Sequence, residues 1–380
     1  MKRLTEFDDL ADPSFSAAVV AWQKTHGRHA LPWQNTRDAY RIWLSEIMLQ
    51  QTQVAAVLGY YARFLERFPT LHDLAAAPAE DVMAQWSGLG YYTRARNLHA
   101  CAKRVVDQYD GVFPSDPLLL AELPGIGRST AAAIAAFSSG ARAAILDGNV
   151  KRVFARVFGI DEFPGVKQVE DGLWRRAIAL LPLQGIEAYT QGLMDLGATL
   201  CTRSRPDCAR CPLQERCMAH ATGRTAELPV RKPKKTIPEK QSALLMLIDA
   251  GQVLLEQRAQ TGIWGGLMSL PELDGHGAIG DIEQQALTAR ALAFGQVEEV
   301  EALLPLVHVF THYKLHIAPF RVALAARHET PAGYLWWDLN EIERAPLPAP
   351  VKKLLATYKS SSENILRCSR IAKRSVMPAM

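Results

Sequence analysis

Apolar side chains recur at a helical spacing through the first part of this chain. Between residues 15 and 220, apolar positions on one face are separated by three or four residues, which is typical of amphipathic helices. One such helix is predicted to carry Leu44, Ile47, Met48 and Gln51. Prolines, which lack the amide hydrogen of a helix interior, mark later boundaries at Pro69, Pro78, Pro114 and Pro117. We therefore predict a mainly α region over residues 1–221.

Beyond residue 241 the apolar pattern becomes that of β-strands. Residues 242–249 form an apolar run, and after a short turn residues 253–258 are predicted to pair back as a hairpin. Further strand-like residues occupy 304–324, and a helix is predicted around 283–294. These elements indicate a smaller α+β domain over residues 242–360.

A basic, proline-containing stretch lies between the two parts. Residues 222–241 combine six lysines and arginines with three prolines, a composition that predicts an extended linker. A solvated tether and a segment that follows a nucleic-acid backbone both remain open. The last residues, 361–380, are basic and without periodicity, so we predict a disordered tail there.

Composition and charge restrict the class of protein without identifying it. A chain of 380 residues favours two domains, and a net charge of +4 permits nucleic-acid binding without requiring it. No apolar run approaches the roughly 18 residues of a membrane span. The first residues carry acids where a signal peptide has an apolar core. We therefore expect no membrane association, a cytoplasmic protein of the bacterial cytosol or nucleoid, and a monomer.

The segment from Leu123 to Thr130 predicts a helical hairpin with a tight turn at Gly125 and Gly127. Glycine tolerates positive φ, and amide hydrogens exposed at such a turn before a helix suit a phosphate oxygen. Asp147 follows about one helix length later, a combination typical of helix-hairpin-helix DNA glycosylases. Asp147 is also a favoured N-cap for the next helix, whose apolar stripe of Val150, Val153 and Val157 excludes Lys151, Arg152 and Arg156.

Four cysteines crowd into one short segment, at Cys201, Cys208, Cys211 and Cys217. In a cytosolic chain such thiols indicate metal binding rather than disulfides. Zinc sites usually pair two short knuckles, whereas here only the middle pair is a Cys-x2-Cys knuckle. The spacing matches the [4Fe–4S] loop of the endonuclease III and adenine glycosylase superfamily. We expect a [4Fe–4S] cluster and keep zinc as the alternative.

Several further segments sharpen the resemblance, among them Leu31-Pro-Trp33, residues 43–54, residues 88–92 and residues 146–152. Together with the hairpin and the cysteines they closely resemble the adenine DNA glycosylase (MutY) family over nearly the whole chain. The resemblance implies excision of adenine from double-stranded DNA containing A:8-oxoguanine or A:G mispairs. The basic residue that this family often carries before Leu-Pro-Trp is not matched, since His29-Ala30 occupies that place after Arg28.

Ser129 distinguishes between the reactions of this superfamily. Endonuclease III-like enzymes carry a lysine at this place, and its amine attacks the sugar to form an imine that permits strand cleavage. Serine cannot form an imine, so we predict a monofunctional glycosylase that leaves an abasic site. A bifunctional oxidised-pyrimidine glycosylase with lyase activity and a non-catalytic iron–sulfur DNA-binding protein remain as alternatives.

Two carboxyl groups are the candidate catalysts. Glu46 lies within an apolar stretch, where desolvation would raise its pKa and keep it protonated near neutrality. The resemblance implies that Glu46 protonates adenine N7 and later helps to deliver water. Asp147, ionised, would stabilise the positive charge that develops on the sugar, or trap it covalently.

The resemblance implies further DNA-binding residues. Gln51 and Tyr91 would act as wedges in the duplex, with Thr52 and Leu89 near 8-oxoguanine. Trp33 and Gln191 would line the adenine pocket, and Asn149 and Ser129 would assist near the sugar. These residues would act on a base that has left the stack.

The C-terminal part resembles a Nudix-like module. The loop over residues 265–272 begins like a Nudix box, but residues 283–289 lack its clustered acids, so we expect recognition rather than hydrolysis. Phe310, Thr311 and His312 match a loop that contacts 8-oxoguanine in the family that the chain resembles.

Overall fold

The computed structural model describes residues 10–232, 237–259, 262–273, 284–310 and 312–360. Contacts divide the chain into two units, one of residues 1–77 with 96–234 and the other of residues 78–95 with 235–380. Thr311 and the predicted tail over 361–380 lie outside the described residues. No helix within the described ranges is long and apolar enough to cross a bilayer.

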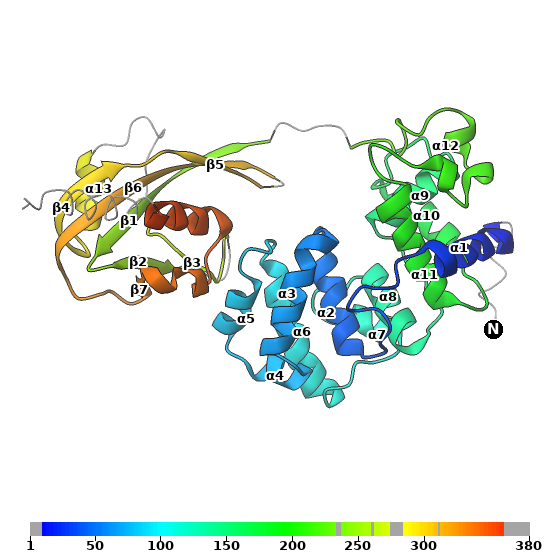
Figure 1. The fold of residues 1–380 in the computed structure, drawn as a ribbon, viewed down its shortest axis with the longest axis horizontal. Coiled ribbons are helices and arrows are strands. Elements are labelled where there is room, and N and C mark those ends of the chain that lie inside the picture. The colour runs from blue at the N-terminus through cyan, green and yellow to red at the C-terminus, as the bar shows by residue number, and fades with distance from the viewer. Residues whose placement is uncertain (1–9, 233–236, 260–261, 274–283, 311, 361–380) are drawn as a thin grey trace, which may run out of the picture. The chain divides into compact units, whose positions relative to one another are not determined.

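The first unit is helical, which confirms the mainly α prediction (Figure 1). Its helices are α1 (Pro13–His26), α2 (Ala39–Leu49), α3 (Val54–Arg67), α4 (Leu71–Ala76), α6 (Thr93–Tyr109), α7 (Pro117–Ala121), α8 (Arg128–Ser139), α9 (Gly148–Val157), α10 (Lys167–Ala179), α11 (Ile186–Asp195) and α12 (Met218–Ala221). Aspartate side chains accept first-turn amide hydrogens of α1, α2, α7 and α9, a strong N-terminal signal. These capping residues are Asp12, Asp38, Asp116 and Asp147.

One helix boundary differs from the prediction. Gln51 was expected on the same helix as Met48, but α2 ends at Leu49. Gln51 has a φ of +56°, a left-handed conformation that a helix cannot contain. The chain turns there into α3, so the Gln51 side chain leaves the face that periodicity assigned to it.

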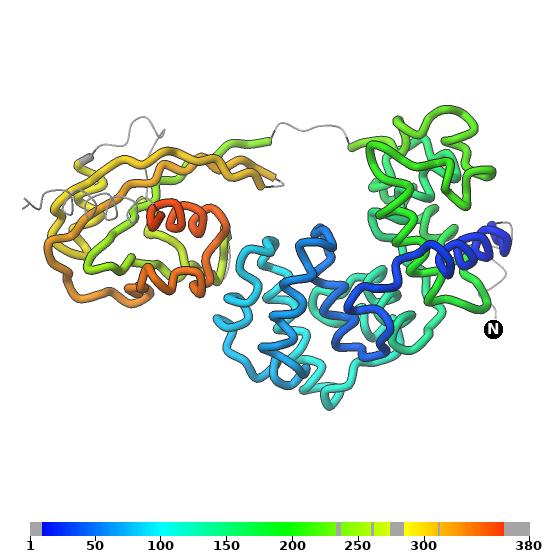
Figure 2. The backbone as a smooth tube through the Cα atoms, in the orientation of Figure 1, coloured from blue at the N-terminus to red at the C-terminus, as the bar shows by residue number. Residues whose placement is uncertain are grey.

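One buried core cluster of this unit joins segments that are far apart in sequence. Phe15 and Val19 of α1 belong to the same buried cluster as Tyr189 and Leu193 of α11. Figure 2 shows the blue N-terminal helix lying along the green segment that contains α11. This packing holds α1 against α11, the helix that supplies Gln191.

The second unit is built on a seven-stranded sheet in the order β3-β2-β1-β6-β4, with β5 paired to β6 and β7 paired to β2. The strands are β1 (Glu239–Asp249), β2 (Gln252–Gln257), β3 (Met268–Ser269), β4 (Gly295–Ala302), β5 (Leu306–Val309), β6 (Lys314–Arg327) and β7 (Tyr334–Asp338). The β1–β2 hairpin and the α+β class are confirmed, while β3, β4 and β7 were not predicted. Helix α13 (Gln284–Ala291) and a helix over 349–360 complete the unit.

Two features of the second unit were not visible in the sequence. Helix α5 (Ala79–Trp86) groups with it, and the Ser87 hydroxyl donates a 2.8 Å hydrogen bond to the carbonyl of Leu347. Strand β1 pairs in parallel with β6, with Ser242 opposite Ile317, while the other pairings are antiparallel. The strand β1 already begins at Glu239, within the segment predicted to be a linker.

Candidate active site

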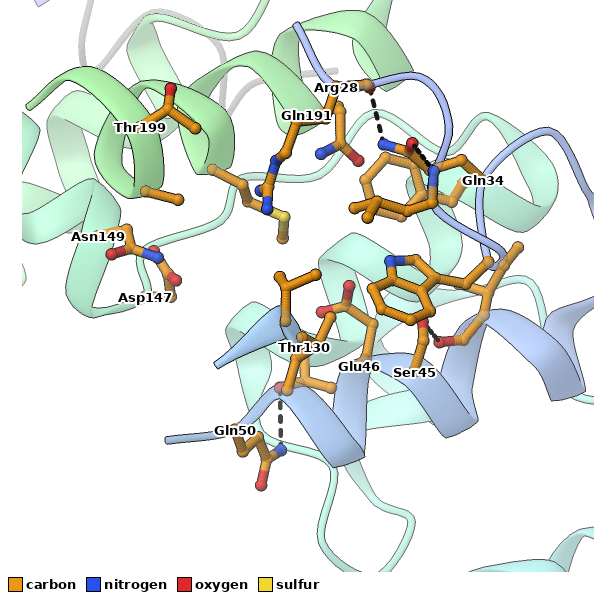
Figure 3. Close-up of a pocket in the computed structure, with 18 of the residues that line it drawn as sticks. Arg28, Gln34, Ser45, Glu46, Gln50, Thr130, Asp147, Asn149, Gln191 and Thr199 are labelled. Carbon is orange, nitrogen blue, oxygen red and sulfur yellow. Dashed lines mark hydrogen bonds between the residues drawn. The ribbon is translucent and has the colours of Figure 1, made fainter. Parts of the chain in front are cut away.

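A cavity of about 1450 Å³ in the helical unit brings many of the predicted site residues together (Figure 3). The segments 28–37, 45–55, 129–130, 147–152 and 187–203 contribute most of its lining. The predicted site residues among them are Trp33, Glu46, Gln51, Thr52, Ser129, Asp147, Asn149 and Gln191. Leu89, Tyr91, Gly125, Gly127, Phe310 and His312 are not part of this lining.

Glu46 projects from α2 into this cavity. Burial and, as a smaller effect, the negative charge of Asp147 together raise the pKa of its carboxyl to about 8. The side chain keeps some exposed surface because it faces the cavity, but Ile42, Leu49 and Trp33 supply apolar walls nearby. A carboxyl group in this setting holds its proton at neutral pH.

Asp147 is the last residue of the loop between α8 and α9, directly before the first residue of α9. Its Oδ1 accepts a 2.8 Å hydrogen bond from the amide of Val150, which confirms the predicted N-cap. Burial raises the pKa of Asp147 on balance, although the Val150 and Asn149 hydrogen bonds and the charge of Arg152 act to lower it. Of the two carboxyls, Asp147 is the one with hydrogen-bond donors and a helix N-terminus to stabilise its anion.

The predicted hairpin joins α7 to α8. Gly125 has a φ of +77°, and a Cβ there would lie 2.8 Å from the Cβ of Asn97. Gly127 is the N-cap of α8 and has no side chain to satisfy the first amides of that helix. Ser129 lies one residue into α8, and its Oγ accepts the Leu146 amide hydrogen at 2.9 Å. Ser129 therefore holds the residue directly before Asp147.

Gln51 and Tyr91 share an unusual backbone geometry. Both have positive φ, at +56° and +51°, and both side chains are exposed, Tyr91 to 45%. The Arg94 guanidinium lies over the Tyr91 ring and donates hydrogen bonds to the carbonyls of Leu89 and Gly90. The Leu89 side chain, in contrast, is buried.

The walls above Glu46 contain a polar network that sequence reasoning missed. Gln191 donates from Nε2 to Oδ1 of Asp195 at 2.8 Å, and Arg28 binds the same carboxylate. Trp33 is nearly buried and packs edge to face on Tyr61, with ring centroids 5.3 Å apart. An aspartate four residues after Gln191, one helical turn along the same face of α11, was the available sequence signal.

The four cysteines line a second, smaller cavity of the helical unit. Arg156, predicted to lie outside the apolar stripe of α9, is instead only 2% exposed and binds this loop. Its guanidinium donates to the Sγ of Cys201 at 3.3 Å and to the carbonyls of Thr202, Arg203 and Leu228. Periodicity misplaced Arg156 because these acceptors come from segments remote in sequence. Within the described residues, no three His, Cys, Asp or Glu side chains are arranged to hold a single metal ion.

The second unit carries a cluster of aromatic rings around the predicted recognition loop. Phe310 stacks on Tyr313 with centroids 4.5 Å apart, and it contacts the rings of His308, His312 and Trp264. In the loop that resembles a Nudix box, Glu272 accepts hydrogen bonds from Ser242 and Arg258. That carboxylate is therefore engaged by protein donors.

Comparison with known proteins agrees with this architecture. Residues 44–177 match the HhH-GPD superfamily of base excision DNA repair proteins, and residues 243–357 match the NUDIX domain. A solved structure of a thermostable thymine-DNA glycosylase is 28% identical and covers 55% of this chain and 96% of its own, with a TM-score of 0.51. The fold and these matches define a helix-hairpin-helix DNA glycosylase with an added Nudix-like domain.

Curated relatives narrow the class further. The adenine DNA glycosylase of Buchnera aphidicola subsp. Acyrthosiphon pisum is 34% identical over 91% of this chain and 98% of its own length. The adenine DNA glycosylase of Rattus norvegicus is 32% identical over 96% of this chain and 82% of its own length. The chain belongs to the adenine DNA glycosylase family.

Proposed function

We propose that the protein removes adenine mispaired with 8-oxoguanine or guanine in double-stranded DNA by hydrolysing the N-glycosidic bond. The observation that carries this proposal is the pair of buried carboxyl groups that line one cavity, Glu46 and Asp147, of which Asp147 accepts an amide hydrogen at the N-terminus of α9. The curated relatives are named adenine DNA glycosylases, and we therefore take adenine as the nucleobase that is excised. The adenine must leave the base stack to reach these groups, since neither can reach a base inside a duplex.

Glu46 acts as the general acid. The adenine anion is a poor leaving group, so the base is protonated at N7 as the bond to C1′ breaks. A pKa of about 8 keeps the Glu46 proton in place at neutral pH until the base enters the cavity. The resulting carboxylate then accepts a proton from the attacking water.

Asp147 stabilises the sugar. Loss of the base leaves an oxocarbenium-like centre at C1′, and the Asp147 carboxylate offers it a fixed negative charge or a covalent partner. The Val150 amide donates to this carboxylate, and the Leu146 amide, which donates to Ser129 Oγ, fixes the residue before it. Asn149, which binds Arg152 through its Oδ1, lies beside it.

We expect base removal without strand cleavage. In a single-turnover assay on a duplex with adenine opposite 8-oxoguanine, strand breaks should appear only after alkali, because Ser129 offers no amine for an imine. Breaks without alkali would mean that another amine acts as nucleophile. Cleavage of a thymine-glycol duplex with no adenine release would favour the alternative, a bifunctional pyrimidine glycosylase.

We propose that Cys201, Cys208, Cys211 and Cys217 hold a [4Fe–4S] cluster, with a structural role. All four line one cavity, and a cubane binds each thiolate at a separate iron, so the sulfurs need not converge on one point. Anaerobically prepared protein should absorb broadly near about 400 nm, a feature of iron–sulfur thiolate ligation. Cys208→Ser should weaken that absorption and Cys101→Ser, at a buried cysteine elsewhere, should not. A colourless protein that contains zinc would contradict the cluster.

We propose that the Nudix-like unit recognises 8-oxoguanine through Phe310 and His312. Both belong to a cluster of rings that offers a stacking surface for a base. Replacing both with alanine should lower the preference for 8-oxoguanine over guanine about tenfold, the value of one lost stacking contact. The exposed His328→Ala in the same unit is the control. An unchanged preference would reject this role.

A further inference from the structure

Asp195 lies behind the base pocket rather than in it. Asp195 is the last residue of α11 and is fully buried, yet it does not line the cavity that contains Glu46. It accepts three hydrogen bonds: from the Arg28 amide at 2.8 Å, from Arg28 Nε at 2.6 Å and from Gln191 Nε2 at 2.8 Å. Both donors line the cavity, and Figure 3 shows them on the segments above Glu46.

The pairing decides which end of the Gln191 amide enters the pocket. An amide has a donor end and an acceptor end of nearly equal shape, and only its partners distinguish them. A carboxylate paired with Arg28 accepts hydrogen bonds and cannot donate them. Gln191 must therefore turn its NH₂ group to Asp195, which leaves its Oε1 for whatever occupies the cavity.

An acceptor at this place discriminates between purines. Adenine carries a 6-amino donor, whereas hypoxanthine carries a 6-oxo acceptor on an otherwise similar ring. Two acceptors facing each other repel, and a buried acceptor without a donor loses free energy. The orientation of one amide thus separates two bases of nearly the same shape.

We infer that Asp195 is a positioning residue that makes the pocket selective for a base with an exocyclic amino group, by fixing the Gln191 amide through a hydrogen bond from behind. The inference rests on the proposed excision of adenine. It concerns the choice of base, which the acid–base roles of Glu46 and Asp147 leave open.

The test is the ratio of single-turnover excision rates for adenine and hypoxanthine, each placed opposite 8-oxoguanine. The wild-type protein should favour adenine by at least about tenfold, the worth of one hydrogen bond to a buried group. Asp195→Ala frees the Gln191 amide to present either end, so the preference should fall at least about fivefold. Asp161→Ala, which removes a surface partner of Arg224, is the control and should keep the ratio.

A second variant keeps the size and the charge of the network. The double variant D195N/Q191E exchanges the two groups. The carboxylate is then at position 191, where either oxygen can accept a hydrogen bond from the base, and the amide is at position 195. This variant should stay within about threefold of the wild-type preference, since the pocket still contains an acceptor. Because it conserves shape, it tests the inference even if Asp195→Ala does not fold.

The outcomes separate the two proposals. If Asp195→Ala slows both bases equally and melts at a lower temperature, Asp195 only supports the fold and the inference is overturned. It is also overturned if the swapped variant folds but loses the preference, or if the wild type excises both bases equally. A wild-type protein that releases no adenine would instead reject the proposed function.

Discussion

Replacing Glu46 with glutamine should lower the single-turnover rate of adenine excision by about a thousandfold, the usual contribution of a general acid. Glutamine has nearly the same shape but cannot give a proton to N7. DNA binding should persist, because Glu46 faces the cavity as an uncharged acid at neutral pH. A gel-shift assay on an A:8-oxoguanine duplex, run beside the rate measurement, separates binding from catalysis.

The pH dependence gives an independent check on this role. The protonated form of Glu46 is the active one, and its pKa is raised to about 8. The wild-type rate should therefore stay level below about pH 8 and decline above it, while the residual rate of Glu46→Gln lacks that decline. Glu187→Gln is the matched control, because Glu187 lines the same cavity but pairs with Arg37 in an exposed position. A Glu46→Gln rate near that of wild type would refute the assignment.

Replacing Asp147 with asparagine should also cost about a thousandfold in excision rate, at the upper end for the loss of one electrostatic stabiliser. Asparagine is an equally good N-cap, and its Oδ1 can still accept the Val150 amide hydrogen. The substitution removes the charge opposite C1′ and keeps the cap. The melting temperature should therefore remain near that of wild type while the rate falls.

Two companion variants complete this measurement. Asp147→Ala loses the cap as well as the charge and should reduce the free energy of unfolding by about 1 kcal/mol. Asp116→Asn makes the same chemical change at the N-cap of α7, outside the cavity lining, and should leave the rate unaltered. If Asp147→Asn kept a near-normal rate, Asp147 would be a cap alone.

The sequence predicted those parts of the site whose signals are local. The cap at Asp147 follows from an aspartate placed before an apolar stripe, and the turn at Gly125 follows from glycine spacing between helices. The β1–β2 hairpin follows from two apolar runs around a short turn. Each of these elements is decided within about a dozen residues, where periodicity and turn chemistry operate.

The missed features depend on partners distant in the chain. Arg156 is buried because carbonyls near residues 202 and 228 converge on it, and the spacing of α9 carries no trace of them. Asp195 gains its role from Arg28, which is 167 residues away in sequence. Strand β4 is polar and lies at the sheet edge, so its hydrogen bonds to β6 specify it more than its composition does.

The left-handed backbone at Gln51 and Tyr91 has a consequence for engineering a more heat-resistant protein. A non-glycine residue with positive φ costs about 1 kcal/mol, so glycine at such a position is a standard stabilising change. Asp110 and Ala250 share this conformation outside the cavity lining and are suitable targets. At Gln51 and Tyr91 the same change would remove an exposed side chain of a proposed DNA wedge. A screen for thermal stability alone would therefore favour glycine at Gln51 and Tyr91. It would raise the melting temperature there at the expense of DNA repair activity.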